Sequence, residues 1–225
     1  MHQISDNVTI QSETAWGQGP GFPGKNWAMY FMYTIQECTN PVVINPGDFR
    51  TQTQGGWGTA CSGNNPGCYR DNHFTAAFPS DAKIGIMSFS NFGATFTSSL
   101  AVEKFLPANG TPGVFTTNYV NPINTSAGVL AGQVLALTLS VTFDQLDPNF
   151  GASSIFLKDL IVADNSSICY GMTVQQVLIQ ANNILAGIPS PLYPPQIPSQ
   201  INSCVDAINN NFVDGTHVGT YLTLP

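Results

Sequence analysis

Charged side chains are scarce in this sequence. Asp, Glu, Lys and Arg together make up 8% of the 225 residues, against about 25% in ordinary soluble domains. We therefore expect the surface to consist mainly of neutral polar residues such as Asn, Gln, Ser and Thr. Because charge normally keeps protein surfaces apart, a surface of this kind resists association only weakly.

Basic residues are fewer than acidic ones, and their scarcity argues against nucleic acids and anionic membranes as partners. Six Lys and Arg stand against thirteen Asp and Glu, which gives a formal net charge of −7. The six cations are scattered along the chain, whereas a phosphate backbone requires clustered cations. We therefore expect no binding to nucleic acid and no adhesion to anionic membranes.

Long apolar runs are also missing. The longest, at 127–141, is interrupted by Gly, Gln, Thr and Ser, so no membrane-spanning helix is expected. The first residues lack a basic region followed by an apolar core, so no signal peptide is recognised there. If the protein is secreted, we expect this chain to be the mature form.

Familiar catalytic motifs are absent as well. The sequence contains no Gly-x-Ser-x-Gly, no His-Glu-x-x-His and no phosphate-binding Gly-Lys-Ser/Thr. Among the three histidines only His73 has polar neighbours in the sequence, and we interpret it as a surface residue at a helix start. A glycosidase requires two facing carboxylates, and no pattern singles out such a pair, although any two acidic residues can meet in the fold. We therefore expect no enzymatic activity and no cofactor.

The five cysteines predict two disulfides. Cys61 and Cys68 bracket six turn-forming residues, so the ends of this loop can reach disulfide distance. Cys169 precedes one predicted helix and Cys204 lies in the next, which allows a second bridge. This pairing favours a secreted or cell-surface protein, and the alternatives are free thiols in a cytosolic protein or, more weakly, a zinc site. Cys38 is then left over, either buried or linking two subunits.

Alternation of apolar and polar residues predicts strands in the first third of the chain. The strand candidates there are 8–11, 29–36, 41–44 and 48–54. Further along, 83–89, 155–162 and 220–224 also resemble strands.

Helical signals dominate the rest. Residues 126–139 are apolar on nearly every face, which is typical of a helix at the centre of a core, although 140–143 also suit a strand. Other helices are expected at 72–78, from Ser98 or Ser99 to Leu106, at 174–185 capped by Thr173, and from Ser199 to Phe212.

This order predicts an α+β fold. We expect an N-terminal antiparallel sheet, or sandwich-like part, packed with a helical C-terminal part around the central apolar helix. The simplest organisation is a single extracellular domain spanning 1–225. A division near Pro107 into a β-rich part (1–107) and a helix-rich part (108–225) is the alternative.

Several strings resemble a poorly characterised domain of secreted and surface proteins of bacteria. The most specific is Gln-Gly-Gly-Trp-Gly at 54–58, and the resemblance covers the chain from Thr14 to about Asp214. The strings that carry it are 14–17, 26–30, 51–58, 63–67, 110–113, 131–137 and 171–178. The resemblance implies an extracellular location and a structural or adhesive setting, and it supplies no catalytic residues.

Aromatic residues are the best candidates for ligand or assembly contacts, because aromatic faces stack on sugar rings. The candidates are Trp16, Trp27, Trp57 and Tyr69, together with His73; Tyr30 and Tyr33 accompany them. Trp57 lies beside two glycines, and an aromatic residue in that position more often packs in the core, so the core interpretation is favoured for it. Structural calcium can be imagined at 144–147, or at 209–211 with Asp214, but neither has EF-hand spacing.

Two functions are compatible with these features. The first is a structural protein that self-associates as a filament, sheath, matrix or surface-layer subunit without catalysis, with the polar segment 1–11 as the expected donor of a strand. The alternative is an adhesion module that binds polysaccharide through exposed aromatics.

Overall fold

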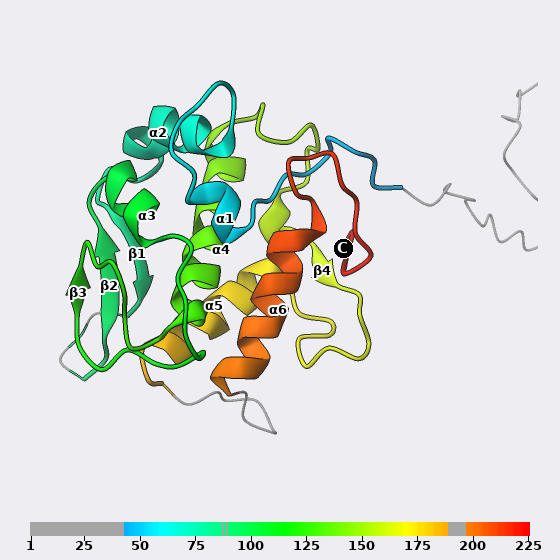
Figure 1. The fold of residues 1–225 in the computed structure, drawn as a ribbon. Coiled ribbons are helices and arrows are strands. Elements are labelled where there is room, and N and C mark those ends of the chain that lie inside the picture. Colours follow the sequence, from blue (N-terminus) through cyan, green and yellow to red (C-terminus); the bar gives the residue numbers. More distant parts are fainter. Residues whose placement is uncertain (1–42, 87, 89, 189–196) are drawn as a thin grey trace, which may run out of the picture. The chain divides into compact units, whose positions relative to one another are not determined.

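The computed structural model describes residues 43–225 except 87, 89 and 189–196 (Figure 1). The chain divides between Val43 and Ile44, and the fold below is that of the unit Ile44–Pro225. The strands predicted at 8–11 and 29–36 lie outside the described residues, as does the donor segment 1–11. The same holds for Trp16, Trp27, Tyr30, Tyr33 and Cys38.

The unit combines helices with a small mixed sheet, so the α+β prediction is confirmed. Its helices are α1 (Gln54–Trp57), α2 (Pro66–Ala77), α3 (Ser99–Phe105), α4 (Val129–Leu146), α5 (Val174–Leu185) and α6 (Pro198–Asn211), with a 3-10 turn at Leu157–Asp159. Its strands are β1 (Ala82–Gly85), β2 (Gly93–Phe96), β3 (Tyr119–Val120), β4 (Ile161–Val162) and β5 (Leu222–Thr223).

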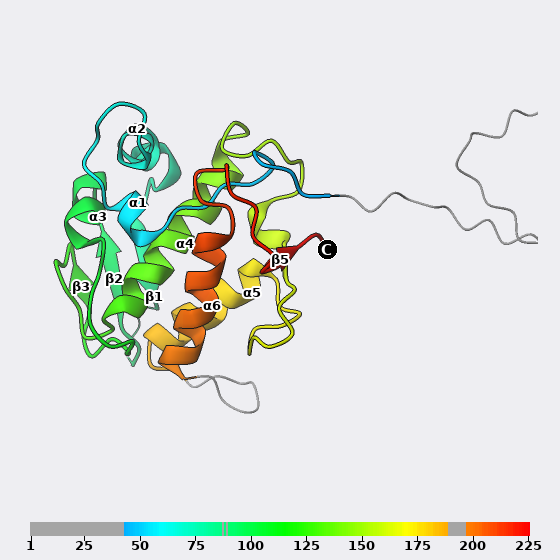
Figure 2. The same cartoon turned by 45° about the vertical axis from the view of Figure 1, so that its right-hand side comes forward.

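Helix α4 is the centre of the unit, as its sequence predicts. It contacts α5, α6, α1 and β1 (Figures 1 and 2), and 13 of its 18 residues are buried. Residues 140–143, which also suited a strand, continue the helix. By length and composition alone α4 could cross a membrane, but 67% of its apolar window is buried inside the unit, as in the core helix of a soluble protein.

Helices α5 and α6 pack against α4 and against each other. Helix α5 begins where the sequence predicts, because Thr173 and Gln176 form a reciprocal capping box. Its buried stripe includes Val174, Val177 and Ala181. Helix α6 begins at Pro198, one residue before the predicted start, since proline is favoured in the first turn of a helix.

The main sheet has the order β1-β2-β3 and is mixed rather than purely antiparallel. Strands β1 and β2 pair antiparallel, with Ile84 opposite Ala94. Strand β3 pairs parallel to β2, with Val120 opposite Thr95. Of the two predicted caps of α3, Ser98 is the one observed, and the Phe105 ring of that helix packs against Phe96 of β2. A second, two-stranded sheet joins β4 and β5.

Several predicted elements differ from the observed ones. The strands predicted at 83–89 and 220–224 are present but shorter, as β1 and β5, and three other elements differ more. Residues 48–54 form no strand: the segment makes a single bridge, from Thr51 to Val213, and Thr53 then caps the short helix α1. Helix α2 starts before residue 72, because Asn65 caps it and Pro66 occupies its first turn. The strand predicted at 155–162 is reduced to a 3-10 turn followed by β4.

One hydrophobic cluster includes residues on both sides of Pro107, from Phe49 to Leu222. The parts before and after this proline therefore share a core within the unit Ile44–Pro225. The single domain expected for the whole of 1–225 stays a prediction.

Replacing Leu135 by Ala is expected to lower the free energy of unfolding by about 2–5 kcal/mol, because the side chain is fully buried in α4 and its removal leaves a cavity. Urea denaturation measures this loss. Ile179→Ala is the matched control, since Ile179 is exposed on α5. A loss for Leu135→Ala no larger than that of the control would contradict its central position.

Candidate functional site

The Gln-Gly-Gly-Trp-Gly string forms helix α1 and serves as a packing element. The Trp57 side chain is 0% exposed, and its Nε1 donates a hydrogen bond to Ser140 Oγ on α4 at 3.1 Å. A Cβ atom at Gly132 of α4 would lie 1.8 Å from Gln54 Oε1, so the glycine permits this close approach. The structure therefore agrees with the core interpretation of Trp57, and this side chain offers no surface to a ligand.

Tyr69 and His73 lie on α2 and belong to an aromatic cluster. Their rings stack with centroids 4.0 Å apart, and the Tyr69 hydroxyl donates to Asp147 Oδ2 at 2.7 Å. Burial, together with this hydrogen bond, raises the pKa of Tyr69 well above its usual value. The Arg50 guanidinium covers the other side, 5.3 Å from the centroids of Tyr69 and Phe150. Both predicted contact residues are only partly exposed and are committed to internal contacts.

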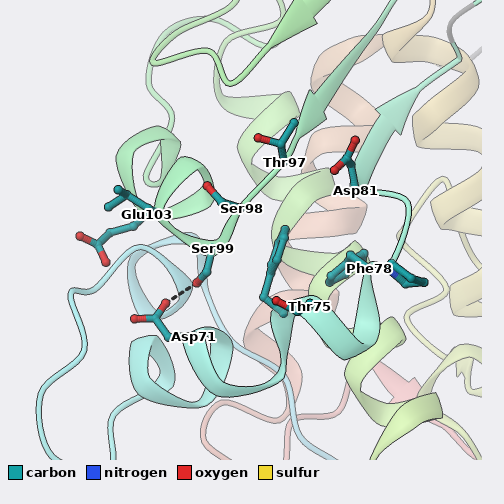
Figure 3. Close-up of a pocket in the computed structure, with 11 residues that line it drawn as sticks. Asp71, Thr75, Phe78, Asp81, Thr97, Ser98, Ser99 and Glu103 are labelled. Carbon is teal, nitrogen blue, oxygen red and sulfur yellow. Dashed lines mark hydrogen bonds between the residues drawn. The ribbon is translucent and has the colours of Figure 1, made fainter.

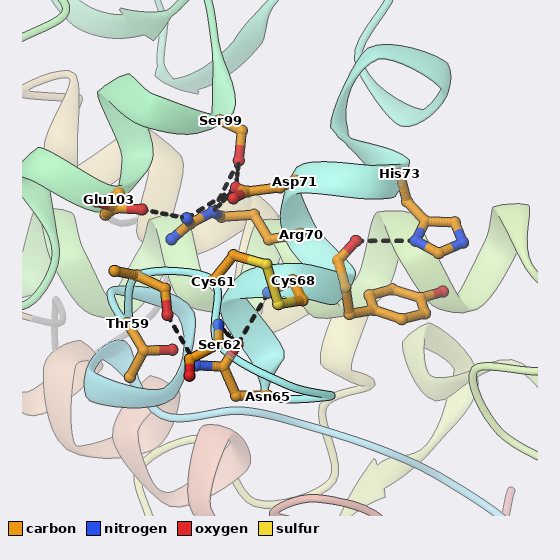
Figure 4. The surroundings of a disulfide bond; sticks show 12 residues. Thr59, Cys61, Ser62, Asn65, Cys68, Arg70, Asp71, His73, Ser99 and Glu103 are labelled. Carbon is orange, nitrogen blue, oxygen red and sulfur yellow. Dashed lines mark hydrogen bonds and ion pairs between the residues drawn. A yellow bond between two sulfur atoms is a disulfide. The ribbon is translucent and has the colours of Figure 1, made fainter.

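Both predicted disulfides are present. The Cys61–Cys68 bond closes the loop that leads into α2 (Figure 4), and Asn65 inside this loop caps the helix. The Cys169–Cys204 bond joins the segment before α5 to α6. Two disulfides are compatible with a secreted protein and suggest an oxidising compartment.

Arg70 connects three helices in a way that the sequence does not reveal. Its side chain is 0% exposed and donates to Glu103 Oε2 at 2.8 Å, to Ser99 Oγ at 2.8 Å, to Asp71 Oδ1 and to the carbonyl oxygen of Trp57 (Figure 4). It thereby joins α1, α2 and α3. A buried arginine requires several partners, and no local pattern announces partners that lie 29 and 33 residues away.

A pocket of about 520 Å³ lies beside this network, between α2, α3 and the start of β1 (Figure 3). Its walls combine carboxylates, hydroxyls and apolar side chains. The lining residues are Asp71, Phe74, Thr75, Phe78, Pro79, Asp81, Thr97, Ser98, Ser99, Leu100 and Glu103. Burial acts to raise the pKa of Asp71, but the hydrogen bonds from Ser99 and Arg70 outweigh it and hold that pKa below its usual value.

The second surface feature is the outer edge of the main sheet. The name β3 edge is used below for residues 116–126. This segment lies within a stretch, 105–143, that contains no Asp, Glu, Lys, Arg or His. Val120 is 70% exposed and Ile123 is 72% exposed, so this segment presents large aliphatic side chains and carries no charge of its own.

The two candidate calcium segments use their side chains internally. Asp144 Oδ2 accepts from the backbone N–H of Leu157 at 2.7 Å, and Asp214 Oδ1 accepts from Gln52 Nε2 at 2.7 Å. Asn209 donates to Gln133. Among the residues described, no group of three or more His, Cys, Asp and Glu is placed to hold a metal ion. Calcium binding therefore gains no support from these segments.

The buried Asp144 makes stability depend on pH. Burial, aided by the nearby Asp159 carboxylate, raises the pKa of Asp144 from 3.8 to about 6 in the folded protein. An acid whose pKa rises on folding favours the folded state at low pH, and this contribution is lost as pH rises from about 4 to about 6. We expect Asp144→Asn to gain stability relative to wild type between pH 4 and pH 7, by up to about 3 kcal/mol.

Urea denaturation of both proteins at several pH values measures this difference. Asp147→Asn is the contrasting variant. The hydrogen bond from Tyr69, the largest influence, lowers the pKa of Asp147. The contribution of a carboxylate with a lowered pKa is complete above about pH 4 and is lost only below it, so the difference in stability between Asp147→Asn and wild type should stay constant between pH 4 and pH 7. Parallel pH curves for wild type and Asp144→Asn would contradict the assignment.

Comparison with known proteins gave no match to a family model, a curated protein or a solved structure. The resemblance drawn from the Gln-Gly-Gly-Trp-Gly string therefore stays a prediction.

Proposed function

We propose that the protein is an extracellular structural subunit that associates with copies of itself through the β3 edge, without catalysis. The observation that carries this proposal is the exposure of Val120 and Ile123 on a segment free of charge. Proteins commonly protect the edges of their sheets with charged side chains. This edge has no such protection.

The backbone of the β3 edge offers hydrogen-bonding groups in addition to these side chains. The N–H of Asn121 donates to the carbonyl of Thr95 on β2 at 2.8 Å. Backbone groups of successive strand residues point to opposite sides, so the N–H and C=O of Val120 point away from β2. The opposite edge of the sheet differs, because Gly85 on β1 donates to Asn182 Oδ1 of α5 at 2.6 Å.

Proline limits how far a partner strand can pair here. Strand β3 ends at Val120, because Asn121 has a left-handed backbone with φ of 47°, and Pro122 has no N–H to donate. A long added strand is therefore disfavoured, and we expect contacts of Val120 and Ile123 to provide most of the association energy. The amides of Asn118 and Asn121 bind back to β2 and hold the edge in place.

A second copy of the chain is the best partner for this surface. An uncharged patch is complementary to itself, since two copies bring no like charges together, and a two-fold axis would pair the same residues twice. A specific contact of this kind buries about 1,200–2,000 Å².

Sedimentation velocity over a wide range of concentration tests this proposal. We expect association that changes little with salt, because few ion pairs are involved. Val120→Lys combined with Ile123→Lys should abolish it, since two copies would then bring four lysines together. Ile179→Lys, at an exposed aliphatic residue on α5, is the matched control and should associate normally. A wild-type protein that stays monomeric at high concentration would overturn the proposal.

A further inference from the structure

The pocket between α2 and α3 contains hydrogen-bond acceptors whose positions are fixed from behind. Asp71 Oδ1 receives bonds from Arg70 and Ser99, and Glu103 Oε2 receives one from Arg70. Within the described part of the chain, the second oxygen of each carboxylate has no hydrogen-bond partner. Because the Arg70 guanidinium is buried and immobilised, these two oxygens are held in place before any ligand arrives.

Asp81 supplies a third acceptor from another side of the pocket. Figure 3 shows Asp81 and Thr97 together, across the opening from Asp71 and Ser99. Asp81 adopts a left-handed backbone conformation, with φ of 65°, and its N–H donates to the carbonyl of Phe78. Its carboxylate has no side-chain partner among the described residues, so its oxygens are available to a ligand.

Apolar side chains complete the lining. Leu100 on α3 is exposed, and Phe78 at the end of α2 is half-buried. Thr75, Thr97 and Ser98 also line the pocket. The pocket therefore combines fixed acceptors, hydroxyls and an apolar contact, and its volume falls within the range of about 300–1,000 Å³ usual for small-molecule sites.

The negative charge of the pocket limits the class of ligand that can bind there. Three carboxylates and one guanidinium leave two formal negative charges, which repel phosphate, sulfate and carboxylate groups. Fixed carboxylate oxygens instead suit a ligand with many hydroxyl donors, since hydrogen bonds to ionised acceptors are the stronger ones. The C–H face of a sugar ring suits Leu100 and the ring of Phe78.

We infer that this pocket binds a neutral saccharide. Its hydroxyls donate to Asp71, Asp81 and Glu103, and one ring face contacts Leu100 and Phe78. This inference does not rest on the proposed function, because the pocket lies on one copy of the chain and the β3 edge contributes none of its lining residues. A matrix subunit with such a site would bind polysaccharide as well as its own copies.

Isothermal titration tests the inference with neutral tetrasaccharides built from glucose, mannose, galactose or N-acetylglucosamine. The protein used is Val120→Lys with Ile123→Lys, so that association does not interfere, and wild type is measured in parallel. We expect at least one tetrasaccharide to bind with a Kd of about 1 mM or tighter. Asp81→Asn and Leu100→Ala should each weaken binding by about tenfold or more.

Asp159→Asn is the control, because it removes an exposed carboxylate outside the pocket, and it should bind as the parent does. Asparagine tolerates the left-handed conformation of Asp81, so Asp81→Asn keeps the backbone intact. No binding by any of the four tetrasaccharides would overturn the inference. The inference would equally be overturned if Asp81→Asn and Leu100→Ala left the affinity for the tetrasaccharide unchanged. Selective binding of an anionic saccharide or of Ca²⁺ alone would also overturn it.

Discussion

Replacing Arg70 by Met is expected to lower the free energy of unfolding by about 3–5 kcal/mol. The guanidinium is fully buried and donates to Asp71, Ser99, Glu103 and the carbonyl of Trp57. Methionine fills much of the volume but satisfies none of these acceptors, and the Trp57 carbonyl would be left without its donor. The two carboxylates are partly exposed and can regain water, which places the loss near the lower end of this range.

Urea denaturation followed by tryptophan fluorescence measures this loss. Lys104→Met is the matched control, because Lys104 is an exposed cation on the adjoining helix α3 and its removal should change stability by less than about 0.5 kcal/mol. Equal effects of the two substitutions would show that the guanidinium does not hold α1, α2 and α3 together.

Replacing Cys169 and Cys204 by Ser is expected to lower the free energy of unfolding by about 3–4 kcal/mol. The bond spans 35 residues, and closing a loop of this length restricts the unfolded chain strongly. Both cysteines are also buried in the core, so two hydroxyls would replace apolar contacts. The expected loss is therefore at least as large as the loop-closure estimate.

The double variant Cys61→Ser with Cys68→Ser is the comparison for this prediction. Its bond spans only 7 residues, and the same estimate gives a smaller loss of about 2.5 kcal/mol. Thermal and urea denaturation of both variants without reductant measure which of them loses more stability. A larger loss for the short loop would mean that contacts around Cys61 and Cys68, rather than loop length, determine the effect.

Local signals predicted the helical part of the unit well. Thr173 places the start of α5, Ser98 or Ser99 the start of α3, and the apolar faces of 126–139 place α4 at the centre. The turn-rich insert between Cys61 and Cys68 indicated a disulfide. Each of these features depends on residues a few positions apart, which is the range that sequence patterns report.

The features that rest on distant contacts could not be predicted. No residue near Arg70 in the sequence indicates that its side chain binds Ser99 and Glu103. The pocket lies where these contacts join α2 to α3. Strand β3 is two residues long, too short for alternation to reveal. The segment 48–54 alternates like a strand, yet Thr53 caps helix α1. This helix approaches α4 closely at Gly132, and Gly58 at its end lies close to the backbone of Leu106.

Hydrogen–deuterium exchange at Val120, measured at low and high protein concentration, tests the central claim most directly. The Val120 amide points away from β2, so it should exchange rapidly in the monomer and slowly once copies associate. The Asn121 amide is the internal reference, because its bond to Thr95 protects it in both states. Association that leaves the Val120 amide as fast as in the monomer would contradict the assignment of the β3 edge as the interface.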